Sequence, residues 1–533
     1  MPDKPSEYHW WQKGVIYQIY IRSFQDSNGD GIGDLPGIVG RLDYLQWLGV
    51  DAVWVTPMYP SPMKDFGYDI SDYQGVHPMF GTMRDFETLV AEVHQRGMKI
   101  VLDFVPNHTS DQHPWFLESR SSRDNPKHDW YLWRDPRPGG VPPNNWLSVL
   151  GGTAWEWDEQ TGQYYYHAFL REQPDVNWRN PEVQEAMRGV MRFWLDKGID
   201  GFRVDVMWHL LKDERYRDNP LNPNYDASQP TYDRFVPVYS TDQPEVHDAV
   251  ALLREQIDAY PDKVLIGEMY LPTDKVVDYY GYNNRGAHLP GNFQLLLASW
   301  NAREIALGID KYEGALPADA WPNWVIGNHD RPRVATRYGK EQARLAAVLL
   351  LTLRGTPTLY YGDELGMRNV PIPPDQVVDP QGLNGGESRD PQRTPMQWDD
   401  GPNAGFTTGQ PWLPLAEGYR EENVKVQRDD PASVLALYRR LLALRRAEPA
   451  LHGGTYAPVP VDGDLIAYLR EAGKERFLVV LNLGGGDAEF KPDPFPFGGR
   501  IALGTDPRRE DEAVRDGVKL AGNEGVVIAL ANG

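Results

Sequence analysis

Short apolar runs that are typical of buried strands alternate with helix-like stretches along most of the 533-residue chain. Between the runs, segments such as Ile38–Leu48 and Phe86–Arg96 carry apolar residues three and four positions apart, as amphipathic helices do. Repeated strand–helix units predict a parallel sheet with right-handed crossovers. An eighth strand in Phe293–Ala298 would close this sheet into a (β/α)8 barrel, an α/β fold. The seven clear strand-like runs are Val15–Ile21, Ala52–Val55, Ile100–Phe104, Gly201–Val206, Val264–Glu268, Trp324–Gly327 and Thr358–Tyr361.

Two stretches interrupt the alternation. Between Pro106 and Trp178, an aromatic segment rich in Gly and Pro replaces the helix expected after the third strand, and its length predicts an inserted subdomain. Beyond Ala443, short strand-like runs alternate with Gly-rich turns, which predicts an antiparallel β-domain. We therefore expect the barrel in residues 1–104 and 178–450, the inserted domain in 105–177 and the C-terminal β-domain in 451–533.

Charge and cysteine content exclude several classes of partner and site. The 54 Lys and Arg and 76 Asp and Glu residues give a net charge of −22, which repels nucleic acids and anionic membranes. With no cysteine, the chain has no disulfide, thiol nucleophile or Cys-ligated zinc. Met1–Trp11 lacks the features of a secretory signal, and the most apolar run, Leu345–Leu353, is too short to span a bilayer. We expect a soluble, cytoplasmic protein.

Polar side chains gather where the predicted strands end. The third strand ends in Asp103–His108, and the fourth carries Arg203 and Asp205. The fifth strand ends at Glu268, and the seventh is followed by Asn328–Asp330. The carboxyl ends of barrel strands meet at one rim, where active sites of such barrels lie. We therefore expect these side chains to converge there.

Clustered carboxylates without cysteine predict either a divalent-metal site or paired acid–base chemistry. Each strand end contributes a single carboxylate, which favours the second interpretation. Arg203 lies two residues before Asp205 and projects to the same face, so its charge should keep Asp205 ionised, as a nucleophile requires. Glu268 beside two anions should have a raised pKa, as a proton donor requires. That division of roles describes retaining glycoside hydrolysis, in which the two carboxyl groups lie about 5–5.5 Å apart.

These strand-end motifs resemble the signature regions of glycoside hydrolase family 13, the α-amylase family, over nearly the whole chain. The resemblance implies a TIM barrel with an inserted domain after strand three and a C-terminal β-domain. It implies that Asp205 is the nucleophile, that Glu268 is the acid and then the base, and that Asp330 holds the 2- and 3-hydroxyls of the sugar. It further implies substrate-binding roles for His108, Phe169 and His329, with Arg203 orienting the nucleophile.

Gln173–Trp178 resembles the QPDLN element of the oligo-1,6-glucosidase and α-glucosidase branch, with Val176 where leucine is usual. In related enzymes a valine after the nucleophile, here Val206, accompanies α-1,6-linked substrates. One methyl-sized change discriminates by only about 1–3 kcal/mol, so it tilts the preference without deciding it. The continuation Met207–Leu210 differs from that of well-known oligo-1,6-glucosidases. We expect isomaltose-like oligosaccharides as substrates, with maltose, sucrose and trehalose as alternatives.

Two further elements resemble parts of a pocket for the end of a sugar chain. In Asp65–Ile70, the resemblance implies that Tyr68 stacks on the terminal glucose and that Asp65 holds its 4-hydroxyl. Arg389–Pro395 resembles the element that supplies the arginine partner of that aspartate, which we assign to Arg393. Such an ion pair would admit only terminal glucosyl units, whereas the alternative is a surface ion pair beside a core tyrosine.

The segment Asp26–Asp34 has oxygen-bearing side chains at alternate positions around a central glycine, as Ca²⁺ sites do. It lacks the glutamate that an EF-hand requires at position twelve, where Gly37 stands. The family resemblance implies a structural Ca²⁺ site, with Mg²⁺ as the alternative ion and a metal-free Asx-rich turn as the alternative structure. Its implied ligands are Asp26, Asn28, Asp30, the carbonyl of Ile32, and Asp34. No organic cofactor is expected.

The predicted function is therefore that of a retaining exo-α-glucosidase acting on a small oligosaccharide or disaccharide, with transglucosylation as a side reaction. A transglucosidase, sucrose isomerase or trehalose synthase would use the same chemistry. The Arg-Leu-Asp-Arg element typical of the isomerases is absent between Trp300 and Trp321. A non-catalytic relative, acting as a binding or chaperone subunit, would lack part of the carboxylate triad. The sequence carries no prediction of oligomeric state.

Overall fold

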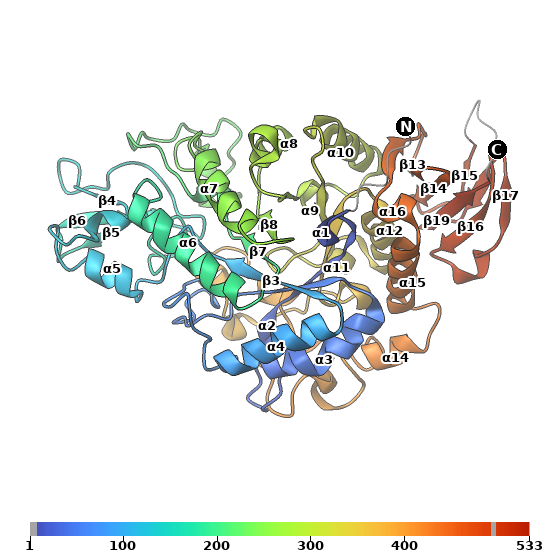
Figure 1. The fold of residues 1–533 in the computed structure, drawn as a ribbon, viewed down its shortest axis with the longest axis horizontal. Coiled ribbons are helices and arrows are strands. Elements are labelled where there is room, and N and C mark those ends of the chain that lie inside the picture. The colour runs from blue at the N-terminus through green and yellow to red at the C-terminus, as the bar shows by residue number, and fades with distance from the viewer. Residues whose placement is uncertain (1–7, 492–496, 532–533) are drawn as a thin grey trace.

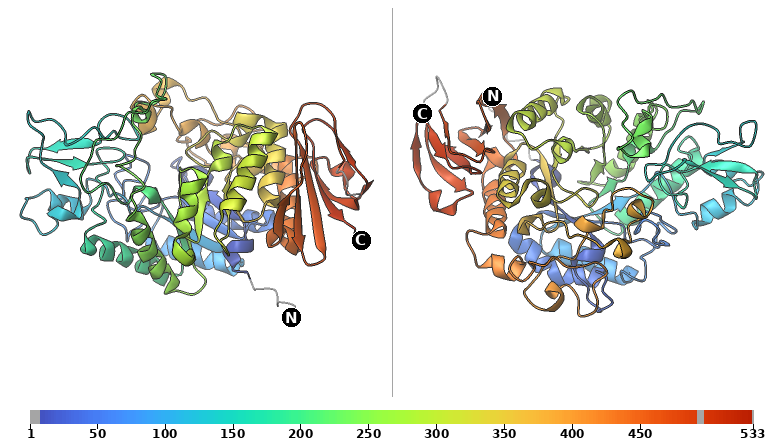
Figure 2. Two further views of the ribbon diagram at one scale, coloured as in Figure 1. Left: turned by 90° about the horizontal axis from the view of Figure 1, so that it is seen from above. Right: turned by 180° about the vertical axis from the view of Figure 1, so that it is seen from behind.

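The computed structural model describes residues 8–491 and 497–531, in which eight parallel strands form a closed barrel (Figures 1 and 2). The strands follow one another around the ring in chain order, and the last pairs with the first. Their residues are almost all buried, because helices cover the outer face of the barrel. The strands are β1 (Ile16–Ile19), β2 (Ala52–Val55), β3 (Lys99–Phe104), β7 (Gly201–Val204), β8 (Val264–Gly267), β9 (Leu289–Asn292), β10 (Asn323–Val325) and β11 (Thr356–Tyr360).

Each long helix around the barrel buries one face against the strands. In α6, for example, Val183, Met187 and Val190 recur at helical spacing on the buried side. Asn180 caps this helix by accepting the N–H of Glu182. The other long helices are α3 (Leu35–Leu48), α4 (Met83–Gln95), α7 (Val246–Asp258), α10 (Ala302–Ala315), α12 (Lys340–Thr352) and α15 (Val434–Ala447), and α6 itself spans Pro181–Asp196. None of the helices within the described ranges is both long and apolar enough to cross a membrane.

The predicted eighth strand at Phe293–Ala298 is wrong, because that segment forms the short helix α9 (Gln294–Leu297). The eighth strand, β9, lies just before this helix, in Leu289–Asn292. Its Pro290 and Gly291 are unfavourable inside strands, so the sequence did not indicate a strand there. A Cβ atom added at Gly291 would lie 2.6 Å from the carbonyl oxygen of Gly267 on β8. The glycine therefore permits the close approach of β9 to β8 that closes the ring.

The segment between β3 and α6 forms the inserted subdomain at the left of Figure 1. Within it, a three-stranded sheet runs in the order β4 (Trp133–Arg134), β6 (Gln163–Tyr166) and β5 (Trp155–Asp158). Aromatic side chains fill its interior, as where the Phe116 and Trp133 rings stack with centroids 5.8 Å apart. The buried carboxylate of Asp175 accepts from Asn107 at 2.9 Å and pairs with Lys212, which attaches the subdomain to the carboxyl end of β3.

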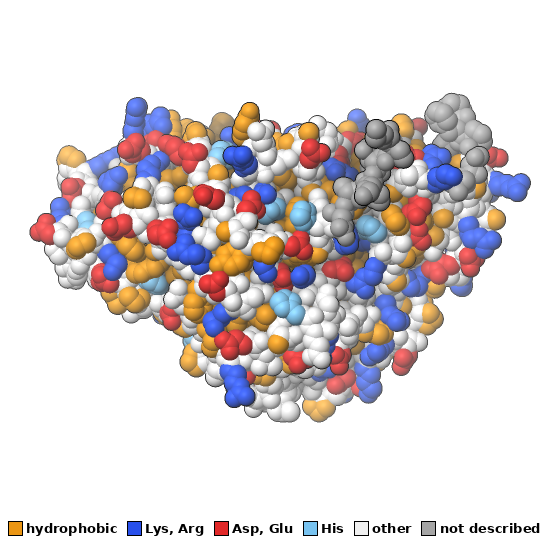
Figure 3. Space-filling view, viewed as in Figure 1, with side chains coloured by type: hydrophobic (Ala, Val, Ile, Leu, Met, Phe, Trp, Pro, Cys, Tyr) orange, Lys and Arg blue, Asp and Glu red, His pale blue; other side chains and the backbone are white. Residues whose placement is uncertain are grey.

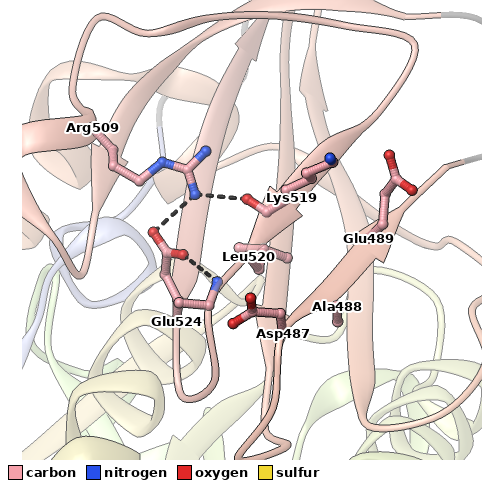
Figure 4. A pocket seen from close by; sticks show the side chains of 8 residues that line it. Asp487, Ala488, Glu489, Arg509, Lys519, Leu520 and Glu524 are labelled. Atoms are coloured by element: carbon pink, nitrogen blue, oxygen red, sulfur yellow. Dashed lines mark hydrogen bonds and ion pairs between the residues drawn. The ribbon is translucent and has the colours of Figure 1, made fainter.

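The C-terminal domain, at the right of Figure 1, is antiparallel, as predicted. Its larger described sheet has the order β12 (Thr455–Pro458), β13 (Leu465–Ala472), β14 (Glu475–Asn482), β19 (Gly525–Leu530), β16 (Gly498–Gly504) and β17 (Ala513–Arg515). A groove in this domain is lined by charged side chains, two of which, Arg509 and Glu524, form an ion pair (Figure 4). There, Arg509 lies 2.9 Å from Glu524 and donates to the carbonyl of Lys519 at 2.8 Å. On the face of the molecule in Figure 3, acidic and basic side chains are interspersed.

Candidate active site

One buried guanidinium group joins the carboxylates at the rim of the barrel. Nη1 of Arg203 donates to Oδ1 of Asp205 and to Oδ1 of Asp103, each at 2.7 Å. Its Nη2 lies 3.0 Å from Oε1 of Glu268. The three strands that carry these residues, β3, β7 and β8, are hydrogen-bonded neighbours. The structure therefore places the carboxyl groups of Asp205 and Glu268 on the same guanidinium, whereas the sequence predicted only that they meet at one rim with Arg203 beside Asp205.

Asp103 belongs to this cluster although the sequence analysis gave it no role. It pairs in register with Arg203 across β3 and β7, so its carboxylate and the guanidinium face each other. It also accepts from Trp54 Nε1 at 2.9 Å and from the Tyr68 hydroxyl at 3.2 Å. The signal in the sequence was its place at a strand end beside the arginine-bearing strand. Asp103 thus contacts Nη1 of Arg203, whereas Glu268 contacts Nη2.

Val206 adopts a left-handed backbone conformation, with a φ of 38°. A positive φ is rare for a β-branched residue, and such strain persists only where the surrounding structure enforces it. The turn aims the N–H of Val206 at Oε2 of Glu268, 2.9 Å away. Glu268 is thus held through both oxygens, by Arg203 on one side and by the backbone beside Asp205 on the other.

Electrostatics in the cluster differ from the expectation that Arg203 keeps the pKa of Asp205 low. Burial raises the pKa of Asp205 well above its ordinary value, and the adjacent Glu268 raises it further, which outweighs the lowering effect of Arg203. Burial likewise raises the pKa of Glu268. The reason is that burial disfavours the charged form of both carboxyl groups, and the one guanidinium that they share offsets only part of this cost.

Asp330 lies at the more open side of the same cluster. Its Oδ1 accepts from Nη2 of Arg393 at 2.9 Å, and its side chain is 23% exposed, against 9% for Asp205 and 5% for Glu268. Although burial opposes it, the ring of His329 and nearby guanidinium groups hold the pKa of Asp330 below its ordinary value. Asp330 is therefore the carboxylate of the cluster that stays ionised.

His329 and Tyr68 contact each other, and His329 lies next to the carboxylate of Asp330. The Tyr68 hydroxyl is 3.0 Å from Nε2 of His329, and the two rings stack with an interplanar angle of 6°. Nδ1 of the same histidine is 2.7 Å from Nε2 of Gln18 on β1. Burial lowers the pKa of His329 to about 3, so the imidazole is neutral near pH 7.

The structure corrects the predicted partner of Asp65. Nη2 of Arg389 donates to Oδ1 of Asp65 at 2.8 Å, whereas Arg393 points to Asp330 and to the carbonyl of His329, 2.9 Å away. The two arginines flank one short turn, and only Arg389 lies on the side that faces the loop after β2. The Asp–Arg pair therefore exists next to Asp330, one of the predicted catalytic carboxylates, but its arginine is Arg389.

The inserted subdomain also contributes residues to the site. Nε2 of Gln173, from the QPDLN-like element, lies 3.2 Å from Oδ2 of Asp65 and 3.2 Å from Nε2 of His108. Burial lowers the pKa of His108 to about 4. The Phe169 ring packs against His108 with a centroid distance of 5.3 Å. The sequence element that resembles the α-glucosidase branch thus touches the predicted end-binding aspartate.

The predicted metal ligands lie in one loop, but their oxygens contact backbone N–H groups. The carboxylate of Asp26 accepts the N–H groups of Asn28, Gly29 and Gly31 at 2.8–2.9 Å. That of Asp34 accepts from Gly37 at 2.7 Å and caps α3. Within residues 8–491 and 497–531, no three Asp, Glu or His side chains are grouped so as to hold a metal ion. This geometry matches an Asx-rich turn, and metal binding stays a prediction.

Comparison with known proteins gives consistent matches along the chain. A family model described as "Alpha amylase, catalytic domain" matches residues 18–454. A probable alpha-glucosidase of Rhizobium meliloti (strain 1021) is 42% identical over 493 residues, which cover 89% of each chain. An oligo-1,6-glucosidase of Parageobacillus thermoglucosidasius is 40% identical, covering 89% of this chain and 90% of the relative. The crystal structure of XgtA, an alpha-glucosyl transfer enzyme, has a TM-score of 0.92 and 40% identity, covering 98% of this chain and 100% of that one.

Proposed function

Because the chain belongs to the α-amylase family of glycoside hydrolases, we propose that it is a retaining, exo-acting α-glucosidase of short oligosaccharides or disaccharides. The observation that carries this proposal is the guanidinium of Arg203, which contacts both Asp205 and Glu268. Contact with one guanidinium keeps the two carboxyl groups close together, which favours the separation of about 5–5.5 Å that retaining enzymes use. Inverting enzymes need a wider separation, of about 6.5–9.5 Å.

In the proposed reaction, a carboxylate oxygen of Asp205 attacks the anomeric carbon while Glu268 gives its proton to the departing glycosidic oxygen. The bond from the anomeric carbon to that oxygen breaks, the aglycone leaves as an alcohol, and a glycosyl ester remains on Asp205. Glu268, now ionised, takes a proton from water, whose oxygen attacks the same carbon and releases Asp205. Two inversions give net retention.

We propose that Asp205 and Glu268 share one proton, because burial raises the pKa of both and the reaction needs one carboxyl ionised and the other protonated. Arg203 contacts both carboxyl groups, and the Val206 N–H contacts Glu268. Asp330 stays ionised and is the carboxylate proposed to hold the 2- and 3-hydroxyls. His108 and His329 are neutral near pH 7, so we assign them hydroxyl binding rather than proton transfer.

Selectivity for the non-reducing end follows in this proposal from the Asp65–Arg389 pair. A carboxylate and a guanidinium 2.8 Å apart offer an acceptor and a donor to one hydroxyl, the 4-hydroxyl of the terminal glucose. In a longer chain that is extended through this oxygen, the next sugar would collide with the pair. Tyr68 supplies the stacking face, and Phe169, whose ring packs against His108, is a further proposed contact with the sugar.

Linkage preference rests on Val206, which is buried next to Asp205 and narrows the space on the aglycone side. We propose isomaltose-like α-1,6 substrates, and the similarity to an oligo-1,6-glucosidase supports this choice. A second candidate is glucosyl transfer to an acceptor sugar, which the similarity to an alpha-glucosyl transfer enzyme favours. Isomerisation of sucrose and synthesis of trehalose remain alternatives of the same chemistry, and a non-catalytic binding role is the alternative of another class.

One experiment separates these candidates: incubation with isomaltose, maltose, sucrose, trehalose and starch, with products and their anomeric form followed by NMR. The proposed function predicts α-glucose as the first product, fastest from isomaltose, and little release from starch. Initial β-glucose would contradict double displacement. Predominant oligosaccharide products would favour transfer, trehalulose or isomaltulose from sucrose would favour isomerisation, and trehalose from maltose would favour a synthase. Absence of any turnover would favour a binding role.

We also propose that the Asp26–Asp34 loop binds a structural Ca²⁺ ion, or Mg²⁺ in its place. Three carboxylates, the amide of Asn28 and the carbonyl of Ile32 are the donor types that a hard cation prefers. Because the carboxylates of Asp26 and Asp34 already accept N–H groups, a cation would have to use their remaining lone pairs. No catalytic step depends on this ion.

A further inference from the structure

Asp379 is the only buried residue of the surface stretch 371–389, every position of which the structure describes. This stretch follows β11 and leads to Arg389, the arginine that faces Asp65. The side chain of Asp379 is 0% exposed. A carboxylate so placed needs charged or hydrogen-bonding partners, since burying it alone is very unfavourable. The hydrogen-bond partners of the Asp379 carboxylate indicate its role.

All the strong contacts of the Asp379 carboxylate are made with Arg389. Oδ2 accepts the backbone N–H of Arg389 at 2.6 Å, and Oδ1 accepts from Nη2 at 2.7 Å and from Nε at 3.0 Å. In return, the carboxylate of Asp390 accepts the N–H of Asp379 at 3.0 Å and that of Val378 at 2.8 Å. Positions 378–379 and 389–390 are therefore held together by reciprocal hydrogen bonds.

The donors of Arg389 that Asp379 leaves free point into the active site. A guanidinium group has five N–H donors in a rigid plane, so fixing one edge fixes the direction of the others. Here Nη2 also reaches Asp65 at 2.8 Å, and Nη1 lies 3.3 Å from Asp330. Although burial opposes it, the charges of Arg389 and Arg393 hold the pKa of Asp379 below its ordinary value, so this clamp is charged at neutral pH.

We propose that Asp379 is a positioning residue that sets the enzyme's selectivity for the end of a sugar chain. It holds Arg389 so that the Asp65–Arg389 pair can bind the 4-hydroxyl, and it does not touch the sugar itself. This inference rests on the proposed function of the same site. Without Asp379, Arg389 can turn toward Asp330, where Arg393 already donates, and Asp65 is left without its partner.

The test compares kcat/KM for 4-nitrophenyl α-D-glucoside with that for its 4-deoxy analogue. A site built to bind a hydroxyl rejects an analogue that lacks it. We expect the wild type to prefer the glucoside, and Asp379→Asn to lower this preference about tenfold or more. In Asp379→Asn, kcat/KM should fall for 4-nitrophenyl α-D-glucoside but not for its 4-deoxy analogue. Because Asp379 contacts neither Asp205 nor Glu268, the pH profile of the variant should match that of the wild type.

Asp375→Asn is the matched control, because the same chemical change then falls on an exposed residue of the same stretch; it should leave the preference unchanged. Asp379→Glu keeps the charge but displaces it, and it should give an intermediate preference even if Asp379→Asn fails to fold. An unchanged preference in Asp379→Glu, or equal losses on both substrates, would overturn the proposal. A wild type that hydrolyses glucosides without distinguishing the two substrates refutes 4-hydroxyl binding at this site, and one that hydrolyses neither refutes the proposed function itself.

Discussion

At the scale of single residues, one arginine organises the chemistry. Arg203 contacts three carboxylates from three neighbouring strands, and each of them would be unstable as a buried charge without it. The backbone N–H of Val206 contacts one of these carboxylates, that of Glu268, and Val206 itself has a strained backbone conformation. Arg203 therefore holds Asp205 and Glu268 together in surroundings that raise the pKa of both carboxyl groups.

Replacing Glu268 by glutamine should remove the proton donor while leaving the shape of the site intact. We expect the rate on isomaltose to fall by roughly 10²–10⁴-fold, the usual contribution of general acid catalysis. The loss should be smaller on aryl glucosides with a good leaving group, which need little protonation. Asp205→Asn is the control, since removal of the nucleophile should affect both substrates alike. Equal losses in Glu268→Gln would argue against its role as the acid.

The pH dependence of kcat/KM should be a bell whose limbs belong to the Asp205–Glu268 pair. Burial raises the pKa of Glu268, so its proton is retained to higher pH than in an ordinary glutamic acid, and the rate falls as pH rises above that value. At low pH the rate falls because the second carboxyl of the pair becomes protonated. In Glu268→Gln, measured on an activated glucoside, the alkaline limb should disappear. A limb that persisted there would assign it to another group.

At the scale of elements, the strands were the easiest part to predict from the sequence, because runs such as Ala52–Val55 are buried on both faces. β9 was missed, since Pro290 and Gly291 contradict strand propensity and only the contact with Gly267 explains them. The rim carboxylates were found from their places at strand ends. Arg389 and Arg393 could not be told apart, because the fold of the turn between them decides which one faces Asp65. Asp379 carried no signal, since its burial arises from tertiary structure alone.

The loop Asp26–Asp34 makes a prediction at this scale. If it binds Ca²⁺, adding the ion to chelator-treated protein should raise Tm in a concentration-dependent way. The gain in the free energy of unfolding should be about 2.7 kcal/mol at a hundredfold excess of the ion over Kd. Asp30→Ala removes a proposed ligand whose side chain is exposed, and it should abolish the ion-dependent shift. Identical Tm values with and without the ion would identify the loop as a metal-free turn, held by the bonds to Asp26 and Asp34.

At the scale of the whole molecule, one buried arginine joins the barrel to the C-terminal sheet. Arg470 on β13 donates to the carbonyls of Gly454 and Thr455 at 3.0 Å and to that of Thr352 at the end of α12. Within the barrel, the buried Arg445 on α15 donates to the carbonyls of Leu351 and Leu353, which lie at the end of the same helix. The contact of Arg470 with Thr352 therefore ties the C-terminal sheet to the end of α12.

Arg470→Met should therefore lower the free energy of unfolding by about 2–6 kcal/mol, because it leaves the buried carbonyls of Thr352 and Gly454 without a donor and each such carbonyl costs about 1–3 kcal/mol. Denaturant unfolding followed by circular dichroism measures this change. Arg476→Met is the control: its pair with Glu471 on the neighbouring strand is 46% and 37% exposed, and its loss should cost less than about 1 kcal/mol. Similar effects of the two substitutions would contradict a special role for Arg470.

The adjacency of β7 and β8 has a consequence for how enzymes of this design diverge. Paired strands lie about 4.7–4.9 Å apart, close to the gap of about 5–5.5 Å that double displacement requires. Backbone hydrogen bonding between β7 and β8 thus holds Asp205 and Glu268, the proposed nucleophile and proton donor, close together, whereas Asp65 and Arg389 lie on loops. Under the proposed mechanism, changes in those loops would alter which sugar or acceptor is bound without altering the anomeric form of the product.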